Sequence, residues 1–405
     1  MVAFKRYFSS GLATKINEVF IVSHARTPMG AFQGSLMKLT ATQLGAAAIR
    51  NSLDKVKLPT SAVEDVIMGC VLQAGLGQAP ARQAAIEAGL PKSTPSTTVN
   101  KVCASGMKAI MLSAANLALG LKSVTVAGGM ESLSNSPFYM KRGATPYGGL
   151  QLLDACHHDG LTDAYTSWHM GKCAEKTAGD MAIGRHQQDD YARESLERLR
   201  NAIDKDVFNG EILPLETKLP RNSGRKAIVS VDADDDMNPF EIDQIPWSQT
   251  PWGSTVTRAS SSKLADGAAA CVLMNNDGLE KYEVKPLAKI LGFVDSAQDP
   301  VDWPTSPALG IKTLLDNLKL KVEDVASYEI NEAFAVVILA NAKILGLDLS
   351  KVNINGGAIG LGHPFGMSGA RITNHLVHTL KEGEIGIASL CNGGGGASTI
   401  AIQKL

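Results

Sequence analysis

The chain has 405 residues, with 39 basic and 40 acidic side chains and a formal net charge of −1. This balance leaves no electrostatic footprint for nucleic acid, and no basic stripe is interleaved with aromatic residues. The longest apolar run, residues 333–340, is far shorter than the roughly 20 residues that span a bilayer. These properties predict a globular α/β protein with no membrane partner. Its 39 glycines are more than the usual share of about 7% of residues, and their positions in the chain need an explanation.

The six cysteines are scattered without a CxxC pair, which argues against a zinc knuckle or a disulfide scaffold and for reduced thiols. Residues 1–17 contain Lys5, Arg6 and Lys15, and no acid appears before Glu18. This composition is typical of a mitochondrial transit peptide and predicts a protein of the mitochondrial matrix. The alternative is a short basic terminus on a cytoplasmic protein.

Strand and helix patterns alternate from Glu18 to about residue 135. Strands are predicted at residues 18–23, 63–68, 97–100 and 123–127, and helices at 40–55 and 107–119. Residues 136–265 differ, because turn-forming residues interrupt them and only one long helix, at 187–203, is predicted. An excursion of this length between α/β segments predicts an inserted lobe that covers a site.

Residues 266–405 repeat the first order, with strands predicted at 327–330, 352–355, 385–390 and 398–403 and a helix at 370–380. Ser105-Gly106 and Ser368-Gly369 each open a segment of 16 residues that closes on a glycine before an apolar strand. A helix that begins after a tight glycine turn and ends at a glycine cap explains both segments. The recurrence predicts two related halves with parallel-type sheets.

Cys103 stands between a predicted strand and a predicted helix, in the run Val99-Asn-Lys-Val-Cys-Ala-Ser-Gly-Met. The free N–H groups and positive dipole end of a helix favour a thiolate, so this position predicts a thiol of lowered pKa. Such a cysteine is a candidate nucleophile. The alternative is a buried structural cysteine, the usual state of a free thiol.

Two further candidates lie in glycine-rich turns near the C-terminus. His363 follows Asn355-Gly-Gly-Ala-Ile-Gly-Leu-Gly, and Cys391 opens Cys391-Asn-Gly-Gly-Gly-Gly directly after a predicted strand. A histidine that titrates near neutrality can act as a general base, and the N–H groups of a glycine run can stabilise an oxyanion. The alternatives are a satisfied core histidine and a flexible loop before the last strand.

Asn331 ends the predicted strand at 327–330 and begins an apolar helix, so it is either a helix N-cap or a residue that holds a water or a carbonyl. The run Cys156-His-His-Asp offers metal-ligating side chains. Adjacent side chains point apart, however, and no fourth ligand is visible. This run predicts a surface turn, and no metal site is expected.

Four runs together, residues 99–109, 331–335, 356–369 and 391–396, resemble the thiolase family in order and spacing. The resemblance extends from about Glu18 to Leu405. It implies a thiolase fold of the α/β class, in which two similar halves, residues 18–135 and 266–405, pack as an αβαβα layered core. Residues 136–265 are the inserted loop domain, and a homotetramer is expected.

The resemblance implies a role for each candidate. Cys103 matches the nucleophile that carries the acyl group as a thioester, and His363 matches the base that activates it. Cys391 matches the acid/base that removes or returns a proton at the acetyl methyl group. Asn331 matches the residue that holds a water which, with His363, surrounds the enolate oxygen. The N–H groups of Cys103 and Gly393 match a second oxyanion hole, around the acyl-enzyme carbonyl.

Six more residues match substrate contacts of the family. His169, Met170 and Phe334 match the pocket near the acyl and pantetheine ends, and Ser262 and Leu264 match a loop that contacts the pantetheine. The sixth of these residues is Tyr191.

Tyr191 matches a tyrosine that lies beside both CoA and potassium in potassium-activated relatives. The run Thr257-Arg-Ala-Ser-Ser-Ser departs from the family here, with Arg258 and Ser261 where small residues are expected. This departure argues against a potassium site, and potassium activation stays an open alternative. Residues 235–249 also depart, so no residue is assigned to the CoA phosphates.

The implied activity is the reversible condensation of two acetyl-CoA into acetoacetyl-CoA and CoA, through an acetyl thioester on Cys103. CoA and acyl-CoA enter as substrates, and no tightly bound cofactor is expected. The Met170 and Phe334 matches favour short chains and admit 2-methyl-branched ones. Two alternatives remain, a thiolase for longer 3-ketoacyl-CoA chains and a non-catalytic protein of the same fold that binds CoA or lipid.

Overall fold

The computed structural model describes residues 16–144, 147–218, 228–235 and 251–405. The predicted leader, residues 1–17, lies outside this part of the chain except for its last two residues. The strands are β1 (Phe20–Arg26), β2 (Gly30–Ala31), β3 (Asp65–Gly69), β4 (Ser96–Val99), β5 (Val124–Ser132), β6 (Phe138–Tyr139), β7 (Leu153–Asp154), β8 (Leu215–Lys218), β9 (Ile228–Val231), β10 (Ala265–Met274), β11 (Ala288–Ala297), β12 (Ser327–Ile330), β13 (Ile385–Asn392) and β14 (Gly396–Lys404). The α-helices are α2 (Ala41–Lys55), α3 (Pro80–Glu87), α4 (Ser105–Ala118), α5 (Met170–Asp180), α6 (Arg185–Asp204), α7 (Asn276–Tyr282), α8 (Ser306–Leu318), α9 (Ala335–Leu345), α10 (Ala358–Leu361) and α11 (Phe365–Thr379).

Local signals in the sequence account for several helix ends. Thr40 precedes α2 and forms a capping box, in which the Gln43 N–H donates to Thr40 Oγ1 and the Thr40 N–H donates to Gln43 Oε1. Gly120 follows α4 and Gly383 follows α11, with φ of 69° and 84°. At Gly120 this left-handed conformation ends α4, as the sequence predicts. The same prediction is wrong for α11, which ends at Thr379 before an extended Leu380, so that Gly383 lies in the turn beyond the helix.

One sheet carries both halves of the chain, in the strand order β12-β13-β14-β11-β1-β10-β5-β3-β4, with β2 paired to β10. The two halves of the sheet meet at the short β1–β11 pairing. Outward from it, the N-terminal half begins with the antiparallel pairings β1–β10 and β10–β5. The C-terminal half begins in the same way, with β11–β14 and β14–β13. A parallel pairing follows in each, β5–β3 or β13–β12. The two halves therefore share one topology, as the recurrent Ser-Gly segments predict.

The prediction of parallel-type sheets is wrong in part, because each half is mixed. β13 ends at Asn392 and β14 begins at Gly396. Parallel neighbours need a crossover of about a dozen or more residues, which the short connection between these strands cannot supply. The glycine turn therefore produces a hairpin.

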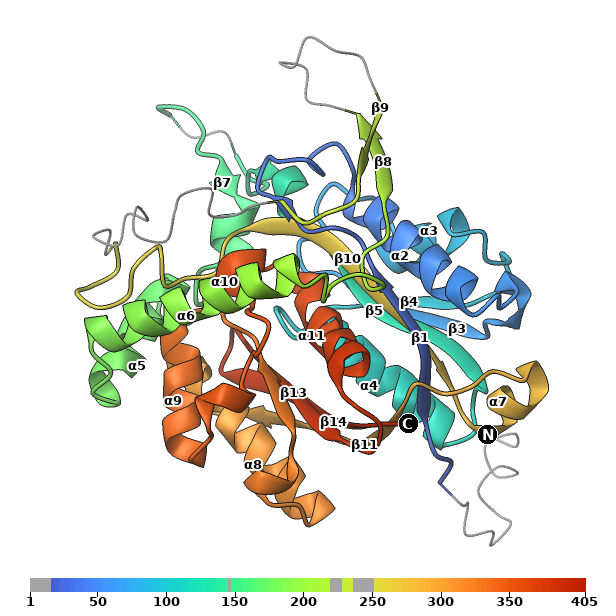
Figure 1. Cartoon of the computed structure of the whole chain (residues 1–405). Coiled ribbons are helices and arrows are strands. Elements are labelled where there is room, and N and C mark those ends of the chain that lie inside the picture. Colours follow the sequence, from blue (N-terminus) through green and yellow to red (C-terminus); the bar gives the residue numbers. More distant parts are fainter. Residues whose placement is uncertain (1–15, 145–146, 219–227, 236–250) are drawn as a thin grey trace, which may run out of the picture.

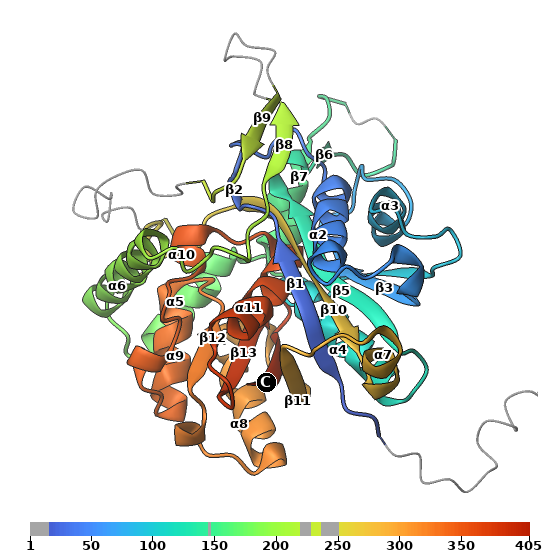
Figure 2. The same ribbon diagram turned by 45° about the vertical axis from the view of Figure 1, so that its right-hand side comes forward.

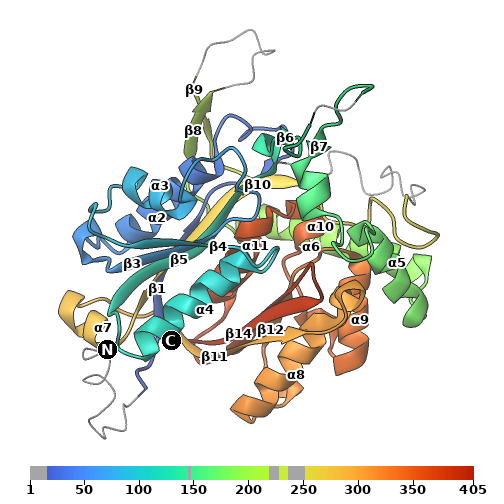
Figure 3. The same cartoon turned by 180° about the vertical axis from the view of Figure 1, so that it is seen from behind.

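The helices form three layers around the sheet, shown in Figures 1 and 3. α2 and α3 cover the outer face of the N-terminal half, and α8, with α9 beside it, covers that of the C-terminal half. α4 and α11 pack against each other between the two halves. This arrangement is the predicted αβαβα core, and it places the N-termini of α4 and α11 near its centre.

The strand predicted at residues 352–355 is not formed. Val352 makes a single parallel bridge to Tyr328, and Asn353 turns away with a φ of 49°. The Asn353 side chain takes the place of a neighbouring strand, because its Oδ1 accepts from the Ile330 N–H at 2.9 Å and its Nδ2 donates to the Ile330 carbonyl at 2.8 Å. One side chain therefore satisfies backbone groups at the edge of β12, where the chain of residues 352–355 makes only a single bridge.

Between β5 and β10 the chain forms the inserted lobe, whose helices α5 and α6 lie against α9. Figure 2 shows these helices beside the C-terminal half, with the β8–β9 hairpin projecting away from the layers. β10 begins at Ala265 and lies between β1 and β5. We therefore propose to count this strand with the N-terminal half, although the division at residue 266 assigns it to the C-terminal half.

Candidate active site

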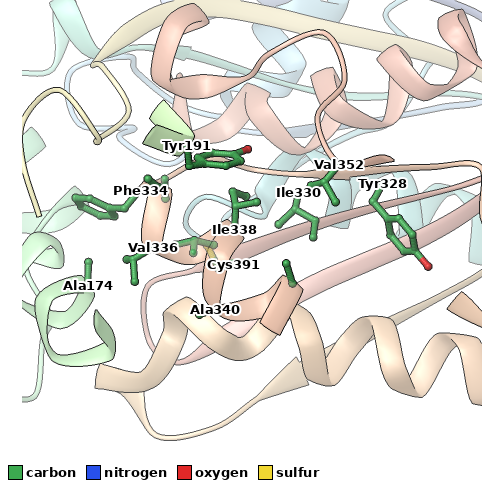
Figure 4. Close-up of a cluster of buried hydrophobic side chains, with 14 of the residues drawn as sticks. Ala174, Tyr191, Tyr328, Ile330, Phe334, Val336, Ile338, Ala340, Val352 and Cys391 are labelled. Atoms are coloured by element: carbon green, nitrogen blue, oxygen red, sulfur yellow. The ribbon is translucent and has the colours of Figure 1, made fainter. Parts of the chain in front are cut away.

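A cavity of about 430 Å³ opens where the two halves and the lobe meet. The predicted site residues that line it are Cys103, His169, Met170, Ser262, Leu264, Phe334, His363, Cys391 and Gly393. Asn331 is not among the described lining residues, but it lies within hydrogen-bond reach of His363. Tyr191 is buried in the apolar cluster of the C-terminal half that Figure 4 shows.

The Cys103 turn connects β4 to α4 and holds its backbone under strain. Val102, directly before the cysteine, has a φ of 48°, which is a rare conformation for a β-branched residue and costs on the order of 1–3 kcal/mol. Ser105 holds the turn, because its Oγ donates to the Val102 carbonyl at 2.6 Å and accepts from the Lys101 N–H at 2.9 Å. The strained turn presents the Cys103 thiol to the cavity, at the N-terminal end of α4.

Burial raises the pKa of the Cys103 thiol to about 12, so the predicted lowering is wrong for the resting structure. The Gly393 N–H and the N–H of Cys103 itself act in the opposite direction, because hydrogen bonds to sulfur favour the thiolate. They offset only part of the cost of burying a charge. The resting nucleophile is therefore a neutral thiol, with the donors for a negative charge already in place.

His363 precedes α11 and keeps only 3% of its surface exposed. Its Nδ1 lies 2.6 Å from Ser368 Oγ, and that hydroxyl donates to the Pro364 carbonyl at 3.0 Å. Since the hydroxyl proton is used, Nδ1 must carry the proton of the ring, and Nε2 is an acceptor that faces Asn331 Nδ2. Burial lowers the pKa of His363 to about 3, and the nearby positive charge of Arg371 acts in the same direction. The ring is thus a neutral base.

Cys391 lies near the end of β13, with 2% of its surface exposed. Burial raises the pKa of its thiol well above the ordinary value, and the charge of Cys103 adds to this effect. The two sulfurs therefore lie close enough to influence one another. The glycine turn follows directly, where Gly394 and Gly395 have φ of 84° and 85°.

Asn331 follows β12 and is 1% exposed. Its Nδ2 lies 3.5 Å from His363 Nε2, while its Oδ1 is buried without a hydrogen-bond partner among the described residues. A buried acceptor without a partner is costly, so this oxygen needs a donor from a water or a substrate. It lies next to Glu332, which accepts from Tyr191 Oη at 2.8 Å and Ser195 Oγ at 2.7 Å. Glu332 thereby ties the lobe helix α6 to the Asn331 segment.

Aromatic rings form one wall of the cavity. The Trp252 ring stacks on His169, with centroids 5.0 Å apart and planes 12° apart, and meets Phe334 edge-on at 5.8 Å. A Cβ on Gly171 would lie 2.2 Å from the Trp252 ring, so only glycine allows this ring to sit over α5. Burial lowers the pKa of His169 to about 4, which leaves an uncharged surface for an acyl chain.

The loop of residues 257–264 joins this wall to His363. The Ser262 N–H donates to the Ala333 carbonyl at 3.0 Å, and the Ala335 N–H donates to the Ser260 carbonyl at 2.8 Å. The His363 N–H donates to the Lys263 carbonyl at 2.8 Å. The loop that carries Ser262 therefore also fixes the backbone of the candidate base.

Sequence reasoning missed several residues of the site, among them Trp252, Ser368, His157 and Glu131. Trp252 follows a proline in the lobe, and nothing local marks it as a wall of a cavity. Ser368 stands five residues after His363, a spacing that could have suggested the contact. His157 lines the cavity 5.7 Å from the ring of His169, so the run at residues 156–159 is more than a surface turn.

Glu131 is the least expected of these residues, since it is a fully buried carboxyl group. It accepts from the N–H groups of Val71, Leu72 and Gly366 at 3.0, 3.1 and 2.9 Å. Burial raises its pKa to about 7. Glu131 joins the loop after β3 to the start of α11, and an acid within the otherwise apolar run of β5 is the signal that could have revealed it.

Comparison with known proteins agrees with this geometry. The family model "Thiolase, N-terminal domain" matches residues 19–277, and "Thiolase, C-terminal domain" matches residues 284–404. The chain is 51% identical over 405 residues to the mitochondrial acetyl-CoA acetyltransferase of Bos taurus, covering 99% of this chain and 95% of that protein. It is 50% identical to the Homo sapiens protein of the same name, with coverage of 99% and 94%.

Solved structures show the same fold. The thiolase Acat5 from Ascaris suum, in complex with coenzyme A, is 43% identical with a TM-score of 0.91, covering 96% of this chain and all of that one. Human mitochondrial 3-ketoacyl-CoA thiolase is 34% identical with a TM-score of 0.91 and the same coverage. The chain belongs to the thiolase family.

Proposed function

We propose that the protein is an acetyl-CoA C-acetyltransferase, which condenses two acetyl-CoA reversibly into acetoacetyl-CoA and CoA. The observation that carries this proposal is one cavity that is lined by Cys103, His363 and Cys391. Relatives that are about half identical over nearly their full length bear the name acetyl-CoA acetyltransferase, which supports the same activity. CoA-linked molecules are the substrates, and no resident cofactor enters the reaction.

In the first half-reaction, Cys103 Sγ attacks the thioester carbonyl while His363 Nε2 takes the thiol proton. Because the pKa of the thiol is high and that of the imidazole is low, the proton moves together with the attack rather than before it. The N–H groups of Cys103 and Gly393 stabilise the tetrahedral oxyanion. Cys391, beside Cys103, gives its proton to the departing CoA thiolate and becomes a thiolate itself.

In the second half-reaction, the Cys391 thiolate removes a proton from the methyl group of the second acetyl-CoA. Protonated His363 and a water held by Asn331 stabilise the enolate oxygen as the charge develops. The enolate carbon attacks the acetyl-Cys103 carbonyl, the carbon–sulfur bond breaks, and the Cys103 thiolate recovers its proton from His363. Both cysteines and the histidine return to their starting states, so the protons balance.

The aromatic wall supports short acyl chains. Trp252, Phe334 and Met170 line the cavity, and we infer that a longer chain would extend against them. A thiolase for longer 3-ketoacyl-CoA chains remains the alternative enzyme, and it needs this wall to move. The non-catalytic alternative does not account for nucleophile, base and oxyanion donors in one place.

We also propose a homotetramer in the mitochondrial matrix. Mitochondrial relatives support the location, and so does the composition of residues 1–17. Phe138, Leu150 and Leu152 are 66%, 56% and 62% exposed in one segment of the lobe, and an apolar surface of this kind supports subunit contact. None of the described helices is long and apolar enough to cross a membrane. A sizing column with light scattering tests the assembly.

The activity is tested by incubating the protein with acetoacetyl-CoA and identifying the modified residue by mass spectrometry. We expect an acetyl adduct on Cys103 and consumption of acetoacetyl-CoA once CoA is added. Cys103→Ser should lose both. Full turnover by that variant would overturn the mechanism, CoA binding without acylation would favour the non-catalytic alternative, and a strong preference for long chains would favour the other thiolase.

A further inference from the structure

Lys263 is a partly buried lysine whose charge is met by backbone carbonyl groups. Its Nζ donates to the carbonyl oxygens of Arg258 at 2.8 Å and of Ser261 at 3.1 Å, within the loop of residues 257–264. No carboxylate of the described residues forms an ion pair with it. Burial lowers the pKa of its ammonium group to about 8. The loop therefore holds a cation with neutral oxygen ligands.

Oxygen atoms of backbone carbonyls are also the ligands that a monovalent metal ion would use, so the carbonyls of this loop bear on the potassium activation that the sequence leaves open. The two carbonyls already accept from Lys263. Tyr191 Oη donates to Glu332 Oε1 at 2.8 Å and accepts from Asn353 Nδ2 at 3.1 Å. A potassium ion at these carbonyls would meet the positive charge of Lys263 at contact distance. The residues present do not fit a potassium ion.

We propose that Lys263 is a positioning residue whose ammonium group serves as the built-in cation of this loop, so that the enzyme needs no potassium from solution. This inference rests on the proposed function, because the loop is taken to hold the pantetheine of a CoA substrate through Ser262 and Leu264. Lys263 closes the loop from within, because its ammonium group joins the carbonyls of Arg258 and Ser261.

The closed loop contacts both parts of the active site. Ser261 forms a β-bridge with Phe334 of the acyl wall, and the Lys263 carbonyl accepts from the His363 N–H at 2.8 Å. Loss of the ammonium group would free two carbonyls and loosen the connection. Because Lys263 does not touch the reacting atoms in this scheme, substrate affinity should suffer more than the chemical step.

The test compares wild type, Lys263→Ala and Lys263→Met in buffers that contain only tetramethylammonium as cation, with and without potassium chloride or propylammonium chloride. Wild-type activity should change less than twofold with either salt. Lys263→Ala should raise KM for acetoacetyl-CoA about tenfold or more with a smaller change in kcat, and propylammonium or potassium should restore part of the affinity. Lys263→Met should resist rescue, because its side chain fills the vacated space.

Acetoacetyl-pantetheine, which lacks the CoA nucleotide and its phosphates, separates this role from direct phosphate binding. If Lys263 acts by holding the loop closed, Lys263→Ala should raise KM by the same factor for both substrates. A rise in KM seen only with the full CoA substrate would overturn this role. Lys312→Ala, on the exposed face of α8, is the matched control, since Lys312 contacts only Asp316 among the described residues.

Three other results would also overturn the inference: potassium activation of the wild type, a KM for Lys263→Ala within twofold of wild type, and no rescue by either cation. If Lys263→Ala does not fold, Lys263→Arg, which keeps the cation, should retain an affinity that Lys263→Met loses. Absence of thiolase turnover in the wild type would instead defeat the proposed function, so the two failures are distinguishable.

Discussion

Gly106 lies in the first turn of α4 and Gly369 in the second turn of α11, and each one lies against the backbone of the other helix. A Cβ on Gly106 would lie 2.6 Å from the Gly366 carbonyl oxygen, and a Cβ on Gly369 would lie 2.6 Å from the Met107 nitrogen. Only glycine permits so close a crossing. This contact brings together the helix starts that carry Cys103 and His363, and it explains why the two Ser-Gly segments recur.

Gly106→Ala should destabilise the protein and reduce turnover, because the added methyl group meets backbone atoms that cannot move aside. Overpacking of this kind costs about 1–3 kcal/mol, and here it also separates nucleophile from base. Thermal unfolding and kcat measure the two effects. Gly179→Ala in α5 is the control, since its Cβ meets no atom within 4 Å, and it should be neutral or slightly stabilising. Equal effects of Gly106→Ala and Gly179→Ala on thermal unfolding and kcat would contradict the close contact between α4 and α11.

Ser368→Ala should lower kcat by roughly 10- to 100-fold, since an unpaired buried N–H costs about 1–3 kcal/mol and the imidazole loses its orientation. KM should change little, because Ser368 is not among the described residues that line the cavity. Steady-state thiolysis kinetics give both constants. Ser113→Ala in α4 is a matched control, as Ser113 Oγ is buried with no partner among the described residues. A loss confined to KM would refute the assigned tautomer.

Trp252→Ala should shift the chain-length profile toward longer acyl groups. The ring stacks on His169 and meets Phe334, so its removal extends the cavity along the aromatic wall. We expect kcat/KM for acetoacetyl-CoA to fall about tenfold, as loss of a packed aromatic contact is worth on the order of 1–2 kcal/mol. Trp168→Ala serves as the control, because Trp168 is not among the described lining residues. An unchanged profile would show that Trp252 does not limit chain length.

His24→Gln should reduce the loss of stability in mild acid. Burial lowers the pKa of His24 to about 3 from its ordinary 6.5, and its Nδ1 has no partner among the described residues. His24 therefore binds a proton more readily in the unfolded chain than in the folded one. The contribution of neutral, buried His24 to the free energy of unfolding is intact above pH 6.5 and falls as the pH drops below it. From pH 6.5 to 5 the loss reaches about 2 kcal/mol at most.

Urea unfolding of wild type and His24→Gln at pH 7 and pH 5 measures this difference. The gap between the two pH values should be smaller in the variant. His186→Gln, at an exposed position of α6, should keep the full gap. A gap of the same size in His24→Gln and wild type would rule out His24 as an acid-sensitive group.

Sequence patterns predicted those elements whose cause is local. Thr40 and Gln43 form a cap that can be read from neighbouring residues, and Gly120 ends α4 through its own φ angle. The candidate residues Cys103, His363 and Cys391 were also predicted, because the sequence placed each one after a strand in a glycine-bearing turn and such turns meet at one edge of a sheet. For His363 that strand is not formed, and Cys391 lies within β13, yet all three line one cavity.

The features that could not be predicted depend on distant parts of the chain. The pKa of Cys103 is set by how deeply the fold buries it, and a helix N-terminus read from the sequence says nothing of that depth. The strand expected at residue 352 is replaced by the Asn353 side chain, which pairs with a strand 23 residues away. Trp252 acquires its position from contacts with His169 and Phe334, which are far away in the sequence and leave no periodic pattern around Trp252.

The crossing of α4 and α11 constrains how chains of this fold can be recombined. The start of each helix packs against the backbone of the other. A hybrid that joins the first half of this protein to the second half of a relative therefore combines two helix surfaces that did not evolve to fit each other. Such a chimaera can retain every side chain of the reaction and still hold its nucleophile at the wrong distance from its base. The glycines of this crossing, among them Gly106 and Gly369, therefore mark a contact that both halves must share, and exchange of segments should succeed where both helix starts are exchanged together.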